Sequence, residues 1–460
     1  MPSRQDQLHS YQFTVQRAVA ALVMRETDPA RSPFRRLAGA GLASVLVAAI
    51  GLGGSALYGL FVGGGSTWRD TGAVIVEKES GARFVYRDGR LHPVLNYASA
   101  LLIVGADRSR TVLVSRRSIE GVPRGLPLGI ADAPDSLPAA GRLSTAPWTV
   151  CSREPADAAH AVPRSALLIG REATGGRRLT EEAVLVRHPD GGLHLIWHQR
   201  RHLLRDTARV LAALATTRER AVPAAPALLN ALPAGADLAP PALAGLGEPS
   251  SGVADATVGD VFLVRNSGGG RQYAVAGRDG LAGITELQAA LLMARTGQDE
   301  PTPISLGRFA ASPKLPDLVP TGPTAPPPAP PRLAGVDGGA LCARIGDDGT
   351  VGEVRVDPVV PDLTAARSTD AAGGVRADQV LVEPGRGAVV ESVAAPGADG
   401  GAVSVVTDLG RRYVLADEGV LGMLGYQGVT PVRLPAGLVS LVPAGSTLDP
   451  AAARAVAAPS

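Results

Sequence analysis

The longest apolar stretch of the chain runs from residue 37 to residue 62 and reads LAGAGLASVLVAAIGLGGSALYGLFV. No charged residue lies between Arg36 and Arg69. As a helix this stretch would extend about 39 Å at ~1.5 Å per residue, which exceeds the ~30 Å hydrocarbon core of a bilayer. The apolar part of a cleaved signal sequence is shorter, and a helix in a soluble protein usually keeps one polar stripe. The pattern therefore predicts a single transmembrane helix over residues 37–62.

The basic residues beside this stretch predict its orientation. Arg31, Arg35 and Arg36 precede the span, whereas Arg69 after it is followed directly by Asp70. The positive-inside rule then places the N-terminus in the cytoplasm and the remaining roughly 390 residues on the outer side of the membrane. Small residues recur within the span, and they either let another helix approach closely or reflect the ordinary composition of membrane helices.

A shorter amphipathic pattern precedes the span. Residues 11–26 read YQFTVQRAVAALVMRE and space their apolar side chains as a helix does, and Asp28-Pro29 would end that helix. Its apolar side would pack on a partner or on the membrane face, or the helix would be a loosely held anchor. We therefore expect residues 1–36 to form a cytoplasmic helical region.

Four stretches beyond the span repeat one pattern of positions. Each begins with an apolar strand, turns at a glycine-containing segment and continues with a second strand that carries a large aromatic side chain. They cover residues 74–97, 184–206, 261–286 and 403–426, with Phe84, Trp197, Tyr273 and Tyr413 as the aromatic residues. Apolar residues at helical spacing follow, so each stretch predicts a β-hairpin and then a helix over one face. One such unit would be marginally stable alone, whereas four can bury one another's apolar faces.

Two strand- and proline-rich segments separate the repeats, at residues 106–180 and 305–395, and each holds one of the two cysteines. Cys151 and Cys342 both lie in strand-like runs on the predicted outer side of the membrane. A cysteine pair in an oxidising compartment is more often a disulfide than a metal or redox site. If the two pair, the segments form one central domain, and closing so long a loop contributes about 5 kcal/mol in the chain-entropy model. Residues 316–332 predict a polyproline II-like surface linker.

The expected fold class is α+β, with a single N-terminal transmembrane helix and an elongated exported region of four hairpin-helix repeats around a β-rich central domain. The predicted divisions in chain order are a cytoplasmic helical region (1–36), the transmembrane helix (37–62), a linker (63–71), repeat 1 (72–105), the first part of the central domain (106–180), repeat 2 (181–222), an Ala/Pro-rich loop (223–256), repeat 3 (257–304), the second part of the central domain with the Pro-rich linker (305–395), repeat 4 (396–446) and a tail (447–460).

Composition narrows the chemistry that is expected. A formal net charge of +2 gives no electrostatic reason to expect nucleic acid. A P-loop needs a lysine directly after a glycine-rich turn. The only two lysines do not meet this need, because Lys78 lies between two glutamates on a predicted strand edge and Lys314 lies between Pro313 and Leu315. The glycine run at residues 268–270 opens a second strand and so predicts a hairpin turn.

The histidines are the one cluster that could suggest a metal site. They are His188, His194, His198 and His202, and the last three are spaced by four residues, which on a helix would suit zinc. The repeat pattern instead places His194 on a strand, His198 at its end and His202 beyond it, and no HExxH motif is present. We therefore predict solvated histidines and no metal site. A GxSxG motif is absent and no carboxylate pair stands out, so the sequence predicts no catalytic residue and no cofactor.

Several segments resemble a known family. They are the N-terminal SRQDQLHSYQF and VQRAVAALV, the DPARSPFRR before the span, and the region from Tyr97 through SRRSIEGVPRGLPLGIADAPDSLP. Together they are similar to the EccB component of actinobacterial type VII (ESX) secretion systems, over essentially the whole length of the chain. The resemblance implies a single-pass inner-membrane subunit with a periplasmic C-terminal region whose repeats are like a phage-lysin cell-wall-binding fold. It also implies that Cys151 and Cys342 match the family's disulfide positions.

The resemblance predicts a structural core subunit of the ESX complex that supports protein export. Its expected partners are the multi-pass channel subunit, the FtsK-like ATPase, a further core subunit and the mycosin protease, together with other copies of itself through the periplasmic domain. Two alternatives stay open. One is ATP hydrolysis, which is attributed to the family although the sequence has no P-loop, and the other is a module that binds peptidoglycan.

Overall fold

The computed structural model describes residues 3–25, 33–62, 66–69, 72–105, 110–154, 162–265, 268–360, 374–395, 397–398 and 400–457. Two compact units divide the chain. The first contains Met1–Asp70, Ile75–Gly81 and Val112–Gly121, and the second contains Thr71–Val74, Ala82–Thr111 and Val122–Ser460.

The first unit begins with helix α1 (Arg4–Met24). A capping box starts it, because the Ser3 hydroxyl accepts a hydrogen bond from the Asp6 amide at 3.3 Å and the Asp6 carboxylate accepts one from the Ser3 amide at 3.1 Å. The helix therefore starts well before residue 11, where the amphipathic pattern predicted it. The predicted stop at Asp28-Pro29 lies outside the described residues.

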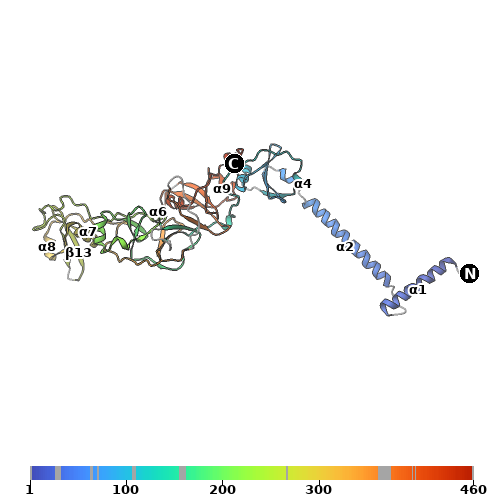
Figure 1. Ribbon diagram of the computed structural model, residues 1–460, viewed down its shortest axis with the longest axis horizontal. Helices are drawn as coiled ribbons and strands as arrows, with labels where there is room; N and C mark the ends of the chain where they lie inside the picture. Colours follow the sequence, from blue (N-terminus) through green and yellow to red (C-terminus); the bar gives the residue numbers. More distant parts are fainter. Residues whose placement is uncertain are drawn as a thin grey trace. The chain divides into compact units, whose positions relative to one another are not determined.

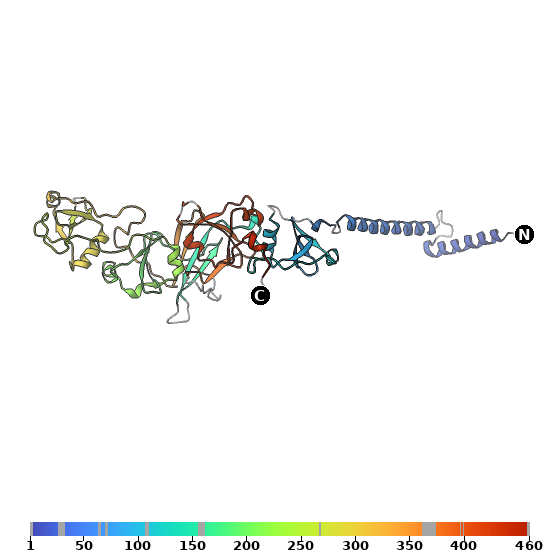
Figure 2. The same ribbon diagram turned by 90° about the horizontal axis from the view of Figure 1, so that it is seen from above.

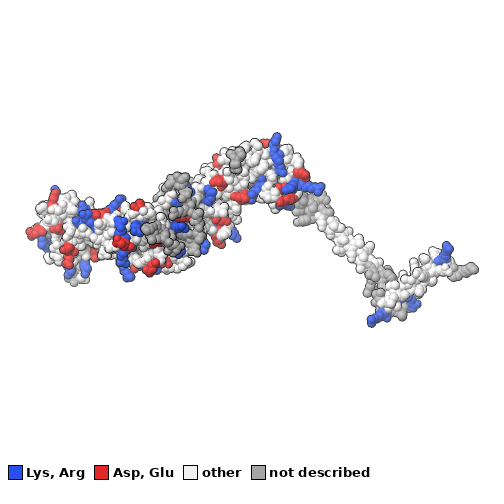
Figure 3. Space-filling view, viewed as in Figure 1, with Lys and Arg blue, Asp and Glu red and all other residues white. Residues whose placement is uncertain are grey.

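Helix α2 (Pro33–Val62) contains the predicted span and is one uninterrupted helix (Figure 1). Residues Ala38–Ser55 have a mean hydropathy of 1.6, and by length and composition this is the one helix among the described residues that could cross a membrane. Its described surface carries neither acidic nor basic side chains (Figure 3). Pro33 is the first helical residue, a position where the missing N–H of proline does no harm. The predicted N-terminal apolar helix is confirmed.

Strands β1 (Ala73–Glu77) and β4 (Arg110–Val114) each have residues in both units, and the short helix α4 (Arg116–Ile119) belongs to the first. Glu77 is 7% exposed, and its carboxylate accepts a hydrogen bond from Arg116 Nε at 2.8 Å. The amide of Lys78 donates to the Val114 carbonyl at 2.9 Å. The second unit starts its regular structure with the hairpin β2 (Arg83–Arg87) and β3 (Arg90–Pro93) and with helix α3 (Tyr97–Val104).

Three four-stranded sheets of the second unit share one strand order. In each, three consecutive strands pair antiparallel, and a fourth strand returns through a helix to pair parallel with the first. The sheets are β8 (Val184–Arg187), β9 (Leu193–Trp197), β10 (Arg200–Leu203) and β11 (Val222–Pro223); β12 (Val261–Arg265), β13 (Arg271–Ala276), β14 (Leu281–Ile284) and β15 (Thr302–Ile304); and β19 (Ala388–Val393), β20 (Ala402–Val406), β21 (Arg412–Val414) and β22 (Val432–Pro435). The connecting helices are α5 (Thr207–Ala213), α7 (Glu286–Thr296) and α9 (Gly419–Met423).

The third strand of each sheet corrects the prediction of a hairpin followed directly by a helix. These strands are only three or four residues long, and β10 reads RRHL, so they show little apolar alternation. The fourth stretch is also one strand out of register with the others. Its apolar run at residues 402–406 is the second strand β20, and its first strand β19 lies before the predicted boundary at 396. Tyr413 accordingly lies on a third strand, whereas Trp197 and Tyr273 lie on second strands.

A short segment after each of these sheets, and one after the β2–β3 hairpin, runs parallel to the third strand (β3 for the hairpin) and adds to its free edge. We call residues 123–128, 233–238, 313–318 and 443–448 the return segments. The proline carbonyl that begins each segment accepts a backbone hydrogen bond from Leu91, Arg201, Leu281 and Arg412, respectively, at 2.8–3.0 Å. Three segments read Pro-x-Gly-x-x-Leu, and the third reads Pro-Lys-Leu-Pro-Asp-Leu.

The glycine of the return segment is required by its neighbour on the third strand. A Cβ at Gly235 would lie 2.2 Å from the His202 ring, and a Cβ at Gly445 would lie 2.3 Å from the Tyr413 ring. Gly125 is equally close to His92. In the remaining sheet the corresponding third-strand residue is Ala282, and Leu315 takes the place of the glycine and packs against the cluster that contains Ala282.

A six-stranded sheet joins segments that are far apart in the sequence (Figure 2). Its order is β18 (Gln379–Val382), β6 (Arg164–Ile169), β5 (Trp148–Arg153), β16 (Ala340–Ile345), β17 (Val351–Val356) and β7 (Arg177–Arg178). One face carries Trp148, Leu167 and Leu341 and belongs to the same apolar core as the helices α6 (Pro226–Ala231) and α10 (Ala436–Val439). The predicted Ala/Pro-rich loop at 223–256 thus holds a buried helix, because Leu228 and Leu229 are covered by this core.

The C-terminal residues were expected to be a tail, and their described part is folded. Asp449 caps helix α11 (Pro450–Ala453), which packs against α3, and Ala453 is fully buried. The Ala457 amide donates to the Pro127 carbonyl at 2.9 Å. The short helix is favoured by Pro450 at its first turn and by alanine at the three positions that follow.

Candidate functional site

Of the arginines predicted to flank the membrane, Arg31 lies outside the described residues, and so do the side chains of Arg35 and Arg36. Arg69, after the helix, is described, and its guanidinium lies 5.0 Å from the Trp68 ring centroid. The basic residues that precede the span are therefore known from the sequence alone.

The two cysteines form a disulfide between adjacent strands of the six-stranded sheet. Cys151 on β5 and Cys342 on β16 lie directly opposite each other in the antiparallel register, although 191 positions separate them in the sequence. Both are buried and pack with Ala166, Leu168 and Val360. The disulfide that the sequence and the family resemblance predicted is present, and it ties the two central segments together.

Two of the four clustered histidines are buried, which corrects the prediction that they are solvated. His202 on β10 is fully covered and His194 on β9 is 8% exposed. The position of His202 was misjudged because it lies on the short third strand, which the apolar pattern did not indicate. Burial is the main cause that lowers the pKa of both imidazoles, and Arg201 lowers that of His194 further.

The other two histidines are partly exposed and have separate partners. His188 Nδ1 lies 2.7 Å from an Asp190 carboxylate oxygen. His198 stacks on Trp197 with ring centroids 3.7 Å apart, and its Nε2 lies 3.7 Å from a Glu181 oxygen. Within the described ranges, no group of three His, Cys, Asp or Glu side chains is placed to hold a metal ion.

Lys314, one of the two lysines, interacts with the end of a short helix. The Lys314 ammonium donates to the carbonyls of Phe309 and Ser312 at the end of helix α8 (Leu306–Ala311) and lies 4.4 Å from the Phe309 ring centroid.

The glycine run at 268–270 connects β12 and β13, whose antiparallel register ends at Arg265 and Arg271. The predicted hairpin turn is confirmed.

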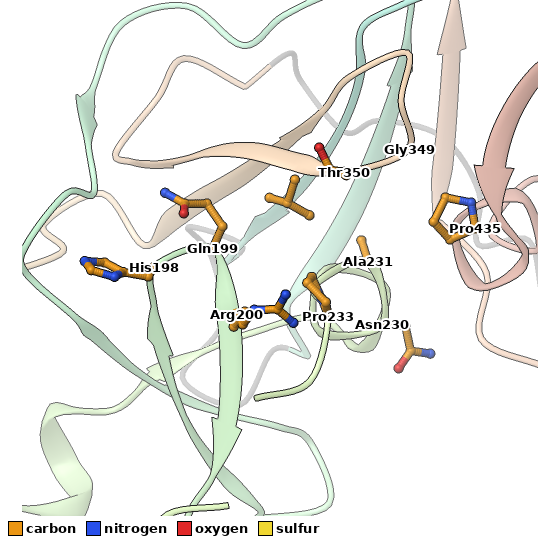
Figure 4. Close-up of a pocket in the computed structure, with 10 residues that line it drawn as sticks. His198, Gln199, Arg200, Asn230, Ala231, Pro233, Gly349, Thr350 and Pro435 are labelled. Atoms are coloured by element: carbon orange, nitrogen blue, oxygen red, sulfur yellow. The ribbon is translucent and has the colours of Figure 1, made fainter. Parts of the chain in front are cut away.

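A cleft of about 400 Å³ opens where the β9–β10 turn, α6, the β16–β17 turn and Pro435 meet (Figure 4). His198 and Gln199 at its rim form a two-residue turn with positive φ at both positions, a conformation that normally selects Asn or Gly. The His198 ring and the Asn230 amide point away from each other (Figure 4). Imidazole, amide, hydroxyl and guanidinium groups line the cleft, from His198, Gln199, Asn230, Thr350 and Arg200.

Residues 1–458 match the family model described as "Type VII secretion system ESX-1, transport TM domain B", or EccB. A curated relative from Mycolicibacterium smegmatis, named "ESX-3 secretion system ATPase EccB3", is 27% identical over 481 residues, which cover 96% of this chain and 88% of the relative.

Two solved structures are similar in fold over most of the chain. One is an intact ESX-5 inner membrane complex, in which the matched chain has a TM-score of 0.68 and 27% identity and the match covers 100% of this chain and 96% of that one. The other is the EccB3 dimer from the ESX-3 core complex, with a TM-score of 0.64, 27% identity, and coverage of 83% of this chain and 100% of that one.

Proposed function

The chain belongs to the EccB family of type VII secretion systems, and we propose that it acts as a structural core subunit of an ESX inner-membrane complex. One observation carries the proposal. The family match and the likeness to the intact complex both run through the apolar helix and the β-rich region, so the similarity includes the membrane anchor and the scaffold together.

We propose that the N-terminus lies in the cytoplasm and the disulfide-bonded region in the periplasm. The arginines before the span support this orientation, and so does the disulfide, because such bonds persist in oxidising compartments. The matched periplasmic assembly from the ESX-5 inner membrane complex is a further support.

The exported region is proposed to consist of four repeated units around the six-stranded central domain, as in a phage-lysin-like arrangement. The support is the shared strand order of three sheets and the return segments, which occur after β2 and β3 as well. We keep the predicted divisions with three changes: the fourth unit begins with β19 at residue 388 instead of at 396, the segment 223–256 contains the buried helix α6, and the described part of 447–460 is folded.

The proposed partners are further copies of this chain and the other ESX membrane subunits: the multi-pass channel subunit, the FtsK-like ATPase, a further core subunit and the mycosin protease. The similarity to a dimer from the ESX-3 core complex supports self-association. The exposed apolar side chains of α1, Leu8, Tyr11, Phe13 and Leu22, support contact between α1 and another apolar surface.

The test is purification of the full chain from native membranes through a C-terminal tag, with mass spectrometry of the proteins that accompany it. An FtsK-like ATPase and a multi-pass subunit are expected in near-stoichiometric amounts. A tagged single-pass protein of unrelated function from the same membranes is the matched control. Recovery of the chain alone in mild detergent would contradict the scaffold role.

A second candidate is ATP hydrolysis, favoured by the names of several relatives, which are called ESX secretion system ATPases. It needs a nucleotide site other than a P-loop, since neither Lys78 nor Lys314 follows a glycine-rich turn. Phosphate release by the purified full chain tests it. Activity that co-elutes with the chain and scales with its amount would support hydrolysis, and activity that separates from it on a sizing column would reject it. Retention by purified peptidoglycan tests the wall-binding alternative in the same preparation.

A further inference from the structure

The Pro-rich segment that the sequence predicts to be a surface linker is docked at two points. Between residues 319 and 328 it passes from the sheet of β12–β15 to the sheet of β8–β11. The Ala236 amide donates to the Thr324 carbonyl at 2.8 Å, and the Leu287 amide at the start of α7 donates to the Pro328 carbonyl at 3.1 Å. Pro327 is buried. We call residues 319–328 the proline strap, because they connect two sheets through contacts with both.

A cavity of about 320 Å³ lies between the proline strap and the β9–β10 hairpin. Trp197, His198, Arg200 and His202 line it from the hairpin, and Val319, Pro320, Pro323 and Pro326 line it from the strap. The Trp197 and His202 ring centroids are 6.3 Å apart. Aromatic side chains are the usual platform for a proline-rich chain in the polyproline II conformation.

His202 is linked directly to the docking of the strap through one residue. Its Nδ1 donates to the Ala236 carbonyl at 2.8 Å, and the amide of the same Ala236 donates to the strap at Thr324. The ring is packed against Gly235, where even a Cβ would lie 2.2 Å from it. The other nitrogen, Nε2, is buried and has no hydrogen-bond acceptor among the described residues. A proton added at Nε2 would therefore create a buried N–H donor without an acceptor on a positively charged ring.

The charges around the hairpin do not supply that acceptor. Arg200 on the same strand opposes a positive charge on His202, whereas the hydrogen bond to Ala236 and the carboxylate of Asp237 favour it. Asp237 itself pairs with Arg205 at 2.7 Å. Residues 319–328 carry no ionisable side chain, and Glu286 of α7 is exposed. Across the hairpin, His194 faces His188, Asp190, Arg201 and Asp237.

We propose that His202 makes the proline strap acid-labile, so that protonation at Nε2 favours opening of the cavity beside the ring, where water can reach Nε2, and releases residues 319–328 from the β9–β10 hairpin. The released state exposes Trp197 and loosens the connection between the sheet of β8–β11 and α7. This device goes beyond the role of a scaffold, because it makes one internal contact of the exported region depend on the pH outside the membrane.

The direction of the pH dependence follows from burial. Burial lowers the pKa of His202 below its ordinary value of 6.5, and that of His194 likewise. The released form therefore binds more protons than the docked form once the pH falls below 6.5. The docked form has its full stability above pH 6.5 and loses it progressively as the pH falls from 6.5 toward the lowered pKa.

The experiment measures the distance between the strap and the hairpin's own sheet in the full chain in lipid nanodiscs. Spin labels on Thr321→Cys in the strap and Ala212→Cys on α5 report it, since both side chains are exposed and the native cysteines are bonded to each other. A narrow distance distribution is expected at about pH 7.5 and a broad, longer one at about pH 5. An unchanged distribution at about pH 5 would overturn the proposal.

Two histidine variants decide whether His202 is responsible. His202→Gln keeps a neutral N–H donor for Ala236 and should retain the narrow distribution at both pH values. His92→Gln is the matched control, because His92 makes the corresponding contact with the Leu126 carbonyl at 3.0 Å in another return segment. The distance distribution of His92→Gln should broaden at about pH 5 as that of the parent does. Broadening of His202→Gln in acid to the same extent as the parent would reject the assignment.

Since His202→Gln could disturb the packing by itself, the parent with native His202 is also titrated. A broadening midpoint below pH 6.5 and above the ordinary carboxyl range of about 4 supports the proposal. A midpoint at about 4 or lower would assign the release to carboxyl groups and overturn it.

Discussion

At the scale of single residues, a glycine in the return segment occurs together with an aromatic or histidine ring on the neighbouring third strand. Gly125, Gly235 and Gly445 each lie against a histidine or tyrosine ring of the third strand, and each leaves no space for a Cβ. Where the third strand has Ala282, the return segment has Leu315. The volume removed from one side is thus supplied by the other, as close packing requires.

This pairing predicts that the effects of Gly235→Ala and His202→Ala on the free energy of unfolding are not additive. Gly235→Ala should lower the free energy of unfolding by about 1–3 kcal/mol through overpacking against His202. In a His202→Ala background the same change should have little effect, because the ring has been removed. Thermal unfolding of the four chains of a double-mutant cycle measures the coupling. Additive losses would contradict the steric explanation.

The buried histidines mark a limit of sequence analysis at this scale. A histidine on a polar-looking run such as RRHL is ordinarily exposed. His202 is covered because the return segment adds a further extended chain beside β10, and that segment is 31 residues away from it at Pro233 in the sequence. The pattern Pro-x-Gly-x-x-Leu was the signal that could have indicated this contact.

At the scale of elements, the apolar helix, the aromatic strands and the hairpin turns follow from local sequence. Their signals are strong because the span has no charge and the strands are apolar over three or four successive residues. The third strands and the parallel fourth strands have no such signal, since β11 has two residues and β15 three. Long-range pairing forms these strands, and apolar periodicity cannot indicate it.

Helix α7 offers a test of how an element is tied to its surroundings. Thr285 and Gln288 form a capping box, and Gln288 Nε2 also donates to the Leu318 carbonyl of the return segment at 2.8 Å. Gln288→Ala should lower the free energy of unfolding by about 1–3 kcal/mol, because it removes the cap and leaves a half-buried carbonyl without this donor. Gln288→Glu keeps the capping acceptor and loses only the donor, so a smaller loss is expected.

The control for this prediction is Ser305→Ala, which removes the exposed cap of α8. Its loss should be at the low end of about 0.5–2 kcal/mol, since solvent replaces the lost partner. Chemical denaturation of each variant measures the differences. Equal losses for Gln288→Ala and Ser305→Ala would show that the bond to Leu318 contributes nothing.

At the scale of the whole molecule, the disulfide joins the two central segments across 191 positions of sequence. The double variant Cys151→Ser with Cys342→Ser should lose about 2–5 kcal/mol of stability. Trp148 is fully buried on β5, three residues from Cys151, so its fluorescence in a Trp68→Phe, Trp197→Phe background reports the central sheet. Reduction of the disulfide in the parent should lower its unfolding midpoint to that of the double variant. The midpoint of the double variant itself should not change on reduction. An unchanged unfolding midpoint on reduction would contradict this contribution.

The six-stranded sheet also orders events in time during synthesis. The sheets of β8–β11 and β12–β15 are complete once residue 304 has been made, because all their strand pairings lie within short stretches of chain. Strand β5 waits for β16 near residue 340, and β6 waits for β18, with Ser165 bonded to Asp378 across 213 positions. These two sheets therefore fold early and locally, whereas the central sheet closes only after residue 382 has been made, which makes it the slower and more aggregation-prone step.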